Sequence, residues 1–148
     1  MTFQEKRSLG LLISNVAVSA IYYLIVYNKF QAGELGSLGD TRMWAAIILL
    51  SIPIYIAANI LMMIMVNIIQ AIATQEEPKD IVDEMDKLIE LKATRNFYHT
   101  FMVGFMLALG SQYLRMEIHV MFIILITTLV LAGIVNEISQ LYFYRKGV

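Results

Sequence analysis

The sequence contains no cysteine, only two prolines and little charge, since 16% of its 148 residues are Asp, Glu, Lys or Arg. Without cysteine the chain has no disulfide framework, no thiolate zinc site and no iron–sulfur cluster. Soluble domains contain about 25% charged residues. The low charge and a hydrophobic fraction of 59% therefore favour a chain whose solvent is lipid. A formal net charge of −1 without a basic stripe argues against nucleic acid as a partner.

Four apolar segments are long enough to cross a bilayer, which requires about 20 apolar residues in a helix. None of them contains an acidic residue, a lysine or an arginine. They are Leu9–Tyr27, Met43–Val66, Phe97–Leu114 and Ile118–Val135. The first segment continues past the small residues that could form a signal-peptide cleavage site, so it is predicted to be an uncleaved anchor. The sequence thus predicts an all-α polytopic membrane protein, a single domain over residues 1–148 with four transmembrane helices.

The distribution of lysine and arginine predicts the orientation, because short basic loops stay in the cytoplasm. Eight of the eleven basic residues lie in the N-terminal tail, in the loop between the second and third segments, or in the C-terminal tail. We therefore expect a multi-pass protein of the cell (cytoplasmic) membrane, surrounded by the lipid bilayer, with both termini in the cytoplasm.

The longest stretch outside the spans, Asn67–Asn96, contains seven of the twelve acidic residues of the chain. Pro78 suits the first turn of a helix, and apolar residues recur after it at helical spacing. An amphipathic cytoplasmic helix is therefore expected over about residues 78–95, before the third span. Its acidic face is either a solvated surface or a docking surface for a cytoplasmic regulatory protein, and it does not suit anionic lipid. The candidate partner surface consists of Asp83, Glu84, Asp86 and Glu90.

The acidic stretch Asp83–Ala93, followed by Arg95 and an aromatic pair, resembles a signature found before the third span in a family of small, uncharacterised prokaryotic four-helix membrane proteins. The ending Gln140–Gly147 is similar to that family's C-terminus. The resemblance implies a four-span protein of the kind often encoded beside a small helix-turn-helix regulator. It implies no catalytic residues.

Polar side chains within apolar spans are the best indicators of a functional site, since each needs a partner in lipid. At 1.5 Å of rise per residue, five such residues fall in the cytoplasmic half of the membrane. They are Asn15, Asn59, His99, Asn136 and Glu137. One interpretation is hydrogen bonding between helices, with Glu137 and His99 reaching water at the interface. The other is a cavity for an ion or a small solute, in which Glu137 and His99 form a proton-sensitive pair.

Metals, cofactors and catalysis are not expected. His99 and His119 are separated by roughly 22 Å of helix, so one haem iron cannot bind both. The methionines near Met63 are typical of adaptable packing rather than of a soft-metal site. No nucleophile with a matching base and no phosphate-binding motif is present, so the chain is predicted not to be an enzyme.

Small residues indicate where helices approach closely. Gly104 and Ala108 form a small-xxx-small pair in the third span, and Ala132 and Gly133 lie in the fourth. Such faces are also compatible with a homo-oligomer.

The leading hypothesis for function is a non-enzymatic regulatory, sensing or immunity-type protein that signals through the acidic helix. The alternative is an oligomeric transporter or channel for ions or small solutes, with the polar cavity facing the cytoplasm.

Overall fold

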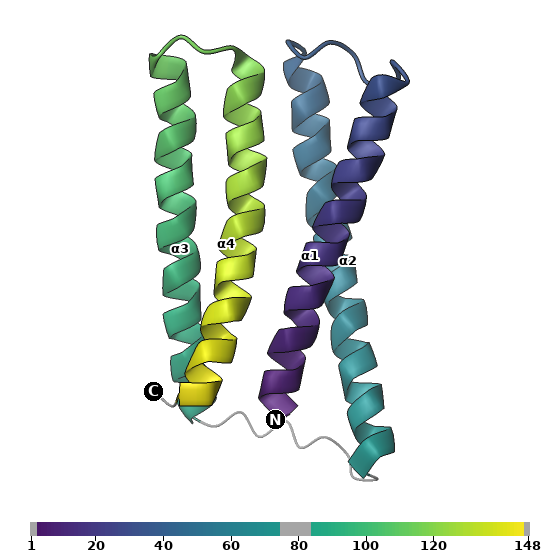
Figure 1. Cartoon of the computed structure of the whole chain (residues 1–148), viewed down its shortest axis with the longest axis vertical. Helices are drawn as coiled ribbons and strands as arrows, with labels where there is room; N and C mark the ends of the chain where they lie inside the picture. The colour runs from purple at the N-terminus through teal and green to yellow at the C-terminus, as the bar shows by residue number, and fades with distance from the viewer. Residues whose placement is uncertain (1–2, 75–83, 147–148) are drawn as a thin grey trace.

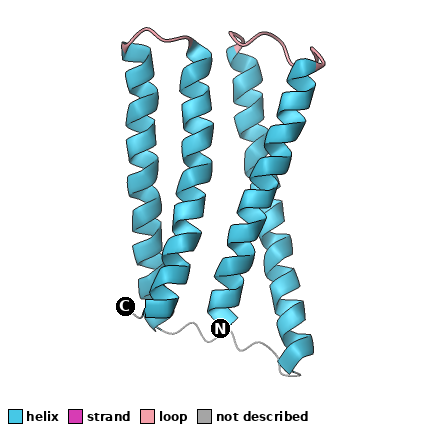
Figure 2. Ribbon diagram, viewed as in Figure 1, coloured by secondary structure: helices cyan, strands magenta, loops and turns pink. Residues whose placement is uncertain are grey.

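The computed structural model describes residues 3–74 and 84–146, in which every regular element is a helix (Figure 2). The four helices are α1 (Phe3–Gln31), α2 (Thr41–Thr74), α3 (Glu84–Tyr113) and α4 (Ile118–Lys146). The all-α prediction is confirmed for the described residues. The predicted cytoplasmic helix is described only from Glu84 onward, where it is continuous with the apolar part of α3.

The helices form two antiparallel hairpins, α1 with α2 and α3 with α4 (Figure 1). Helix α4 is the centre of the bundle, since it packs most extensively on α3 and also contacts α1 and α2. Among the described helices, α3 contacts α4 alone. Both chain termini lie at one end of the bundle, here called the terminal end, and the two short loops lie at the other, the loop end (Figure 1).

Three helices are long and apolar enough to cross a membrane, namely Gln4–Gln31, Thr41–Ile69 and Ile118–Lys146. Their outward faces expose large apolar side chains such as Tyr23, Leu49 and Leu61. Exposed apolar surface of this extent is typical of a protein that is covered by lipid. Helix α3 does not reach the same apolarity, because its first half is charged and its second half contains His99, Ser111 and Gln112. The structure therefore supports a helical membrane protein with three such helices, and the crossing by α3 stays a prediction.

The contact between α3 and α4 is made by small residues, as the sequence predicts. A Cβ atom on Gly104 would overlap the side chain of Thr128, so only glycine permits this approach. Ala108 and Ala132 are fully buried in the same contact. Gly133 does not take part, because a Cβ atom there would meet nothing within 4 Å.

At the loop end, Trp44 of α2 joins its helix to α4. Its ring stacks on Phe122 with 6.0 Å between ring centroids, and its indole Nε1 donates a hydrogen bond to the Leu38 carbonyl at 2.9 Å. Asp40 caps the N-terminus of α2, since its Oδ1 accepts a hydrogen bond from the Arg42 backbone N–H at 2.9 Å. These contacts fix the position of α2 relative to α4.

Candidate functional site

Glu137 on α4 is the acidic residue of the predicted polar cavity, and it is buried, with 7% of its surface exposed. Its Oε1 accepts a hydrogen bond from Asn136 Nδ2 at 3.3 Å. Its Oε2 is also buried but makes no hydrogen bond with the described residues. A buried polar atom without a partner costs about 1–3 kcal/mol. This oxygen is therefore a place where a proton, an ion or a water molecule would be stabilised.

Arg7 of α1 supplies the positive charge that acts on Glu137. Its guanidinium also donates to Met63 Sδ of α2 at 3.8 Å, so Arg7 lies where α1, α2 and α4 come together. One residue further on, the buried Ser8 donates its Oγ proton to Gln140 Oε1 at 3.3 Å. Sequence reasoning counted Arg7 only as a basic residue of the N-terminal tail. Its role depends on the register of α1 against α4, for which the sequence gives no local signal.

Asn15 and Asn59 lie at one level of the α1–α2 pair. Ser19 Oγ and Tyr55 Oη are 2.5 Å apart and join the two helices. Asn15 is one turn before Ser19, and Asn59 is one turn after Tyr55. Because the two helices are antiparallel, the two amides lie at the same height along the bundle. Asn59 Oδ1 is buried and makes no hydrogen bond with the described residues. A second unsatisfied oxygen thus lies in the α1–α2–α4 unit.

His99 lies on α3 and is exposed. Its ring contacts Tyr98 edge-on, with 5.9 Å between ring centroids. Among the described residues, the side chains found to act on Glu137 are Asn136 and Arg7. The structure thus brings Asn136 to Glu137 and Asn15 to the level of Asn59. The pairing of His99 with Glu137 stays a prediction.

The described part of the candidate partner surface, Glu84, Asp86 and Glu90, lies at the start of α3 and is called the acidic surface from here on. Glu84 and Glu90 are exposed, and Asp83 lies outside the described residues. Asp86 is half-buried, and its carboxylate accepts a hydrogen bond from the Tyr144 hydroxyl. The helix also buries Ile89 and Ala93, and Lys92 Nζ lies 5.6 Å from the centroid of the Phe143 ring. The start of α3 is therefore held on α4 by polar and apolar contacts together.

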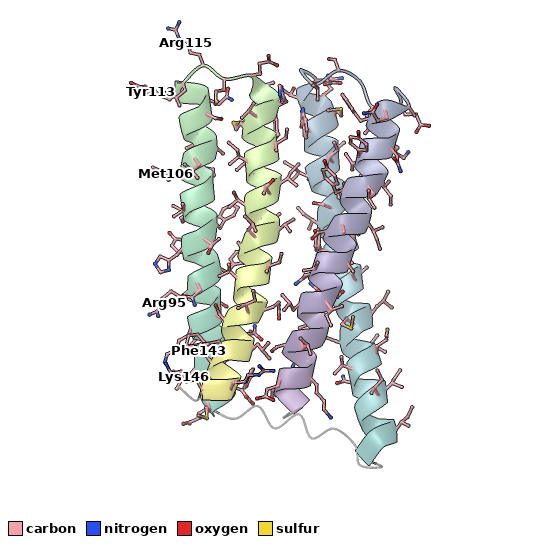
Figure 3. All side chains as sticks on the ribbon, in the orientation of Figure 1. Arg95, Met106, Tyr113, Arg115, Phe143 and Lys146 are labelled. Carbon is pink, nitrogen blue, oxygen red and sulfur yellow. The ribbon has the colours of Figure 1, made fainter. Side chains whose placement is uncertain are left out.

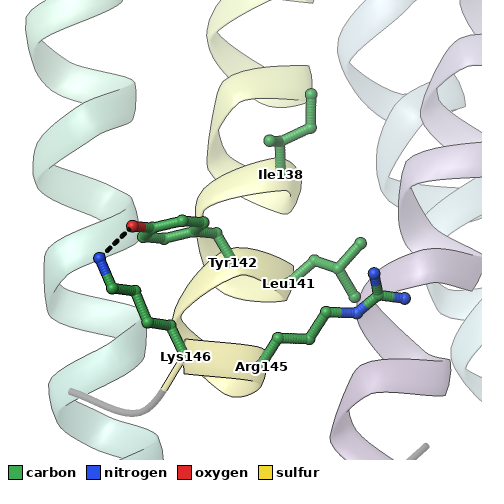
Figure 4. A pocket seen from close by; sticks show the side chains of 5 residues that line it. All are labelled: Ile138, Leu141, Tyr142, Arg145 and Lys146. Atoms are coloured by element: carbon green, nitrogen blue, oxygen red, sulfur yellow. Dashed lines mark hydrogen bonds between the residues drawn. The ribbon is translucent and has the colours of Figure 1, made fainter.

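An open depression of ≈ 520 Å³ lies near the end of α4 (Figure 4). It is lined by Ile138, Leu141, Tyr142, Arg145 and Lys146. Lys146 Nζ donates a hydrogen bond to the Tyr142 hydroxyl at 2.8 Å and lies 5.4 Å from the centroid of its ring. None of the five predicted cavity residues lines this depression, so it belongs to the α4 terminus and not to the Glu137 region.

The outer side of α3 faces away from α4. Figure 3 shows Arg95, Met106 and Tyr113 pointing outward from the helix. Leu91 and Tyr98 are also well exposed on this helix. The structure therefore leaves one side of α3 open to lipid, to water or to another protein.

The fold and its exposed apolar side chains define a class, an all-helical bundle with three helices that could cross a membrane. In comparisons with protein-family models, with curated proteins and with solved structures, the chain matches none of them.

Proposed function

We propose that the chain is an integral protein of the cell membrane, with all four helices inserted and both termini in the cytoplasm. Three helices have the necessary length and apolarity. Helix α3 packs on α4 through small residues and runs from the terminal end to the loop end beside it (Figure 1). Packing on α4 covers Ser111, which is buried in the bundle and donates its hydroxyl proton to the Ala108 carbonyl at 2.7 Å. This contact lowers the cost of inserting the least apolar of the four helices.

The function that the geometry supports best is non-enzymatic sensing or regulation, with the acidic surface as the output. The supporting observation is that α4 contacts two regions at the terminal end. Its Gln140 bonds to Ser8 of α1, and its Tyr144 bonds to Asp86 at the start of α3. Gln140 and Tyr144 lie about one turn apart on α4, so a ligand that displaces this end of α4 relative to α1 would carry the start of α3 with it.

The expected partner of this surface is a cytoplasmic regulatory protein with a basic face. Glu84 and Glu90 are exposed on the described part of the acidic stretch. Charges of opposite sign speed encounter and select the partner more than they add affinity. A small helix-turn-helix regulator, which the family resemblance implies as a genomic neighbour, is the first candidate.

The experiment places a photo-crosslinking amino acid at Leu91, an exposed position next to the acidic surface, in the full chain inside growing bacterial cells. We expect a covalent adduct with a cytoplasmic protein. The variant Glu84→Lys/Glu90→Lys should lose it. The control Glu117→Lys reverses an exposed acid at the loop end and should keep it. An adduct that survives the first variant, or forms with lipid alone, contradicts the proposal.

A second candidate function is the passage of protons or small cations, which the unsatisfied Glu137 Oε2 favours. Ionisable groups buried in membrane helices often mark ion pathways. The test is proton flux into liposomes that contain the purified chain and a pH-sensitive dye. This function predicts flux above that of empty liposomes, lost in Glu137→Gln and kept in Glu117→Gln. Flux at the level of empty liposomes removes it.

A further inference from the structure

A hollow of ≈ 590 Å³ lies between α1 and α2 at the loop end, far along the bundle from Glu137 and from the acidic surface. Its walls are apolar, and Ile25, Leu50 and Ile54 among them are 42–60% exposed, so the hollow is a groove that opens sideways. Its mouth is charged, with Lys29 and Arg42 among the lining residues. An apolar groove with charge only at one end suits an amphiphile.

Among the described residues, one cation at the mouth has no ion pair. Lys29 Nζ is 3.4 Å from Glu34 Oε2, so these two charges offset each other. Asp40 also lines the groove, and its Oδ1 accepts the Arg42 backbone N–H as the helix cap. The Arg42 side chain is exposed, and within the described residues it has no ion pair. Arg42 lies in the first turn of α2, where the helix dipole adds positive potential. Of the four charged groups that line the mouth, the Arg42 guanidinium alone has neither an ion pair nor a capping role among the described residues, so it is the group available to bind a phosphate.

The length of the groove matches one leaflet of a membrane. Arg42 and Ile54 are twelve residues apart on α2, which is roughly 18 Å of helix. The hydrocarbon core of a bilayer is about 30 Å thick, so half of it is about 15 Å. With the loop end at the membrane surface, Arg42 lies at the level of the headgroups and Ile54 lies near the middle of the bilayer.

We propose that this groove binds one anionic phospholipid. Its phosphate receives charge-assisted hydrogen bonds from the Arg42 guanidinium, and one acyl chain lies along Ile25, Leu50 and Ile54. The inference rests on the proposed function for the placement of the chain in the membrane. It deepens that function, because a lipophilic ligand of the sensing protein would compete with this lipid for the groove between α1 and α2. It does not depend on a partner for the acidic surface.

Trp44 is a built-in reporter for this site, since it is the only tryptophan in the sequence. It is buried in one cluster with Met43 and Ile47, and both of these residues line the groove. Bromine atoms on an acyl chain in the groove would come close to the indole and quench its fluorescence. Quenching of Trp44 therefore measures occupancy of the groove.

The experiment reconstitutes the full chain in phosphatidylcholine vesicles with a minor fraction of brominated phosphatidylglycerol, or the same fraction of brominated phosphatidylcholine. We expect stronger quenching by the anionic lipid. Arg42→Gln should lower the preference for phosphatidylglycerol about tenfold, which corresponds to about 1.4 kcal/mol. Arg115→Gln removes an exposed arginine from the other loop at the same end and should leave the preference unchanged.

A second pair of variants tests the groove without changing charge. Ala45 and Ala46 are adjacent and exposed, but only Ala46 lines the groove. Ala46→Phe fills it and should reduce quenching by phosphatidylglycerol to the phosphatidylcholine level, whereas Ala45→Phe should not. Equal quenching by both lipids would overturn the proposal. An equal loss of the preference for phosphatidylglycerol in Arg42→Gln and in Arg115→Gln would also overturn it. So would loss of the preference on adding inorganic phosphate, which would make a free anion the ligand.

The two proposals fail in different ways. If Trp44 quenching shows a preference for phosphatidylglycerol but no crosslink forms from Leu91, the lipid site is supported and the signalling role of the acidic surface is contradicted. If the crosslink forms but the two lipids quench equally, the signalling role is supported and the lipid site is contradicted.

Discussion

The two hairpins of this bundle are held together by different means. Helices α3 and α4 meet through Gly104, Ala108 and Ala132, so their backbones approach closely and leave little space. Helices α1 and α2 are joined by polar bonds, such as the one between Ser19 and Tyr55, and enclose a groove at the loop end. Tight small-residue packing favours one arrangement, whereas a hydrogen-bonded pair beside a groove can accommodate a ligand. We therefore propose that the α1–α2 pair receives the ligand and that α3 and α4 form the rigid pair.

The largest expected effect is on the rigid pair. Gly104→Val should lower the free energy of unfolding by about 3 kcal/mol, because its Cβ would overlap Thr128. The measurement is chemical denaturation of the purified chain in detergent micelles. Gly110→Val is the matched control, since a Cβ atom on Gly110 meets nothing within 4 Å. Equal losses in the two variants would show that α3 and α4 do not approach closely at Gly104.

An intermediate effect is expected where the acidic surface meets α4. Tyr144→Phe removes the hydrogen bond to Asp86 and should cost about 1 kcal/mol of unfolding free energy. It should also lower the yield of the crosslink from Leu91, because the start of α3 is less firmly held. Tyr142→Phe removes a hydroxyl that bonds to Lys146 of the same helix and should leave the yield unchanged. A crosslink yield that falls equally in both variants contradicts the coupling through Tyr144.

The smallest effect is expected in the α1–α2 pair. Hydrogen bonds between membrane helices contribute about 0.6 kcal/mol on average. A double-mutant cycle of Ser19→Ala with Tyr55→Phe should therefore give a coupling energy near that value. Ser51→Ala with Tyr55→Phe is the control pair, because Ser51 bonds to the Ile48 carbonyl within α2. A Ser19 coupling of zero would remove the polar connection between these helices.

Local sequence features predicted the local structure well. Small residues at a four-residue spacing in the third span indicated the α3–α4 contact, because two helices approach closely only where the facing side chains are short. The positions of Arg7 and of Asn15 relative to Asn59 depend on the register between helices far apart in sequence. Composition gives no information on register, so Arg7 was missed and the groove beside Arg42 was not anticipated.

Helix α3 shows the limit of reading spans from charge alone. Phe97–Leu114 contains no charged residue, which predicts a span, yet its polar side chains leave it less apolar than the other three helices. Its one described packing partner, α4, covers the small-residue face, and the opposite face, with Arg95, Met106 and Tyr113, is open (Figure 3). A homo-oligomer stays a prediction.

The membrane topology is the central claim, and single-cysteine labelling tests it most directly, because the natural sequence contains no cysteine. Cysteine is introduced at Ser37 or Met116 in the two loops, or at Leu88 at the start of α3. An impermeant maleimide applied to intact cells should label the first two positions and should label Leu88→Cys only after the membrane is opened. Labelling of Met116→Cys and Leu88→Cys from the same side would show that α3 does not cross the membrane.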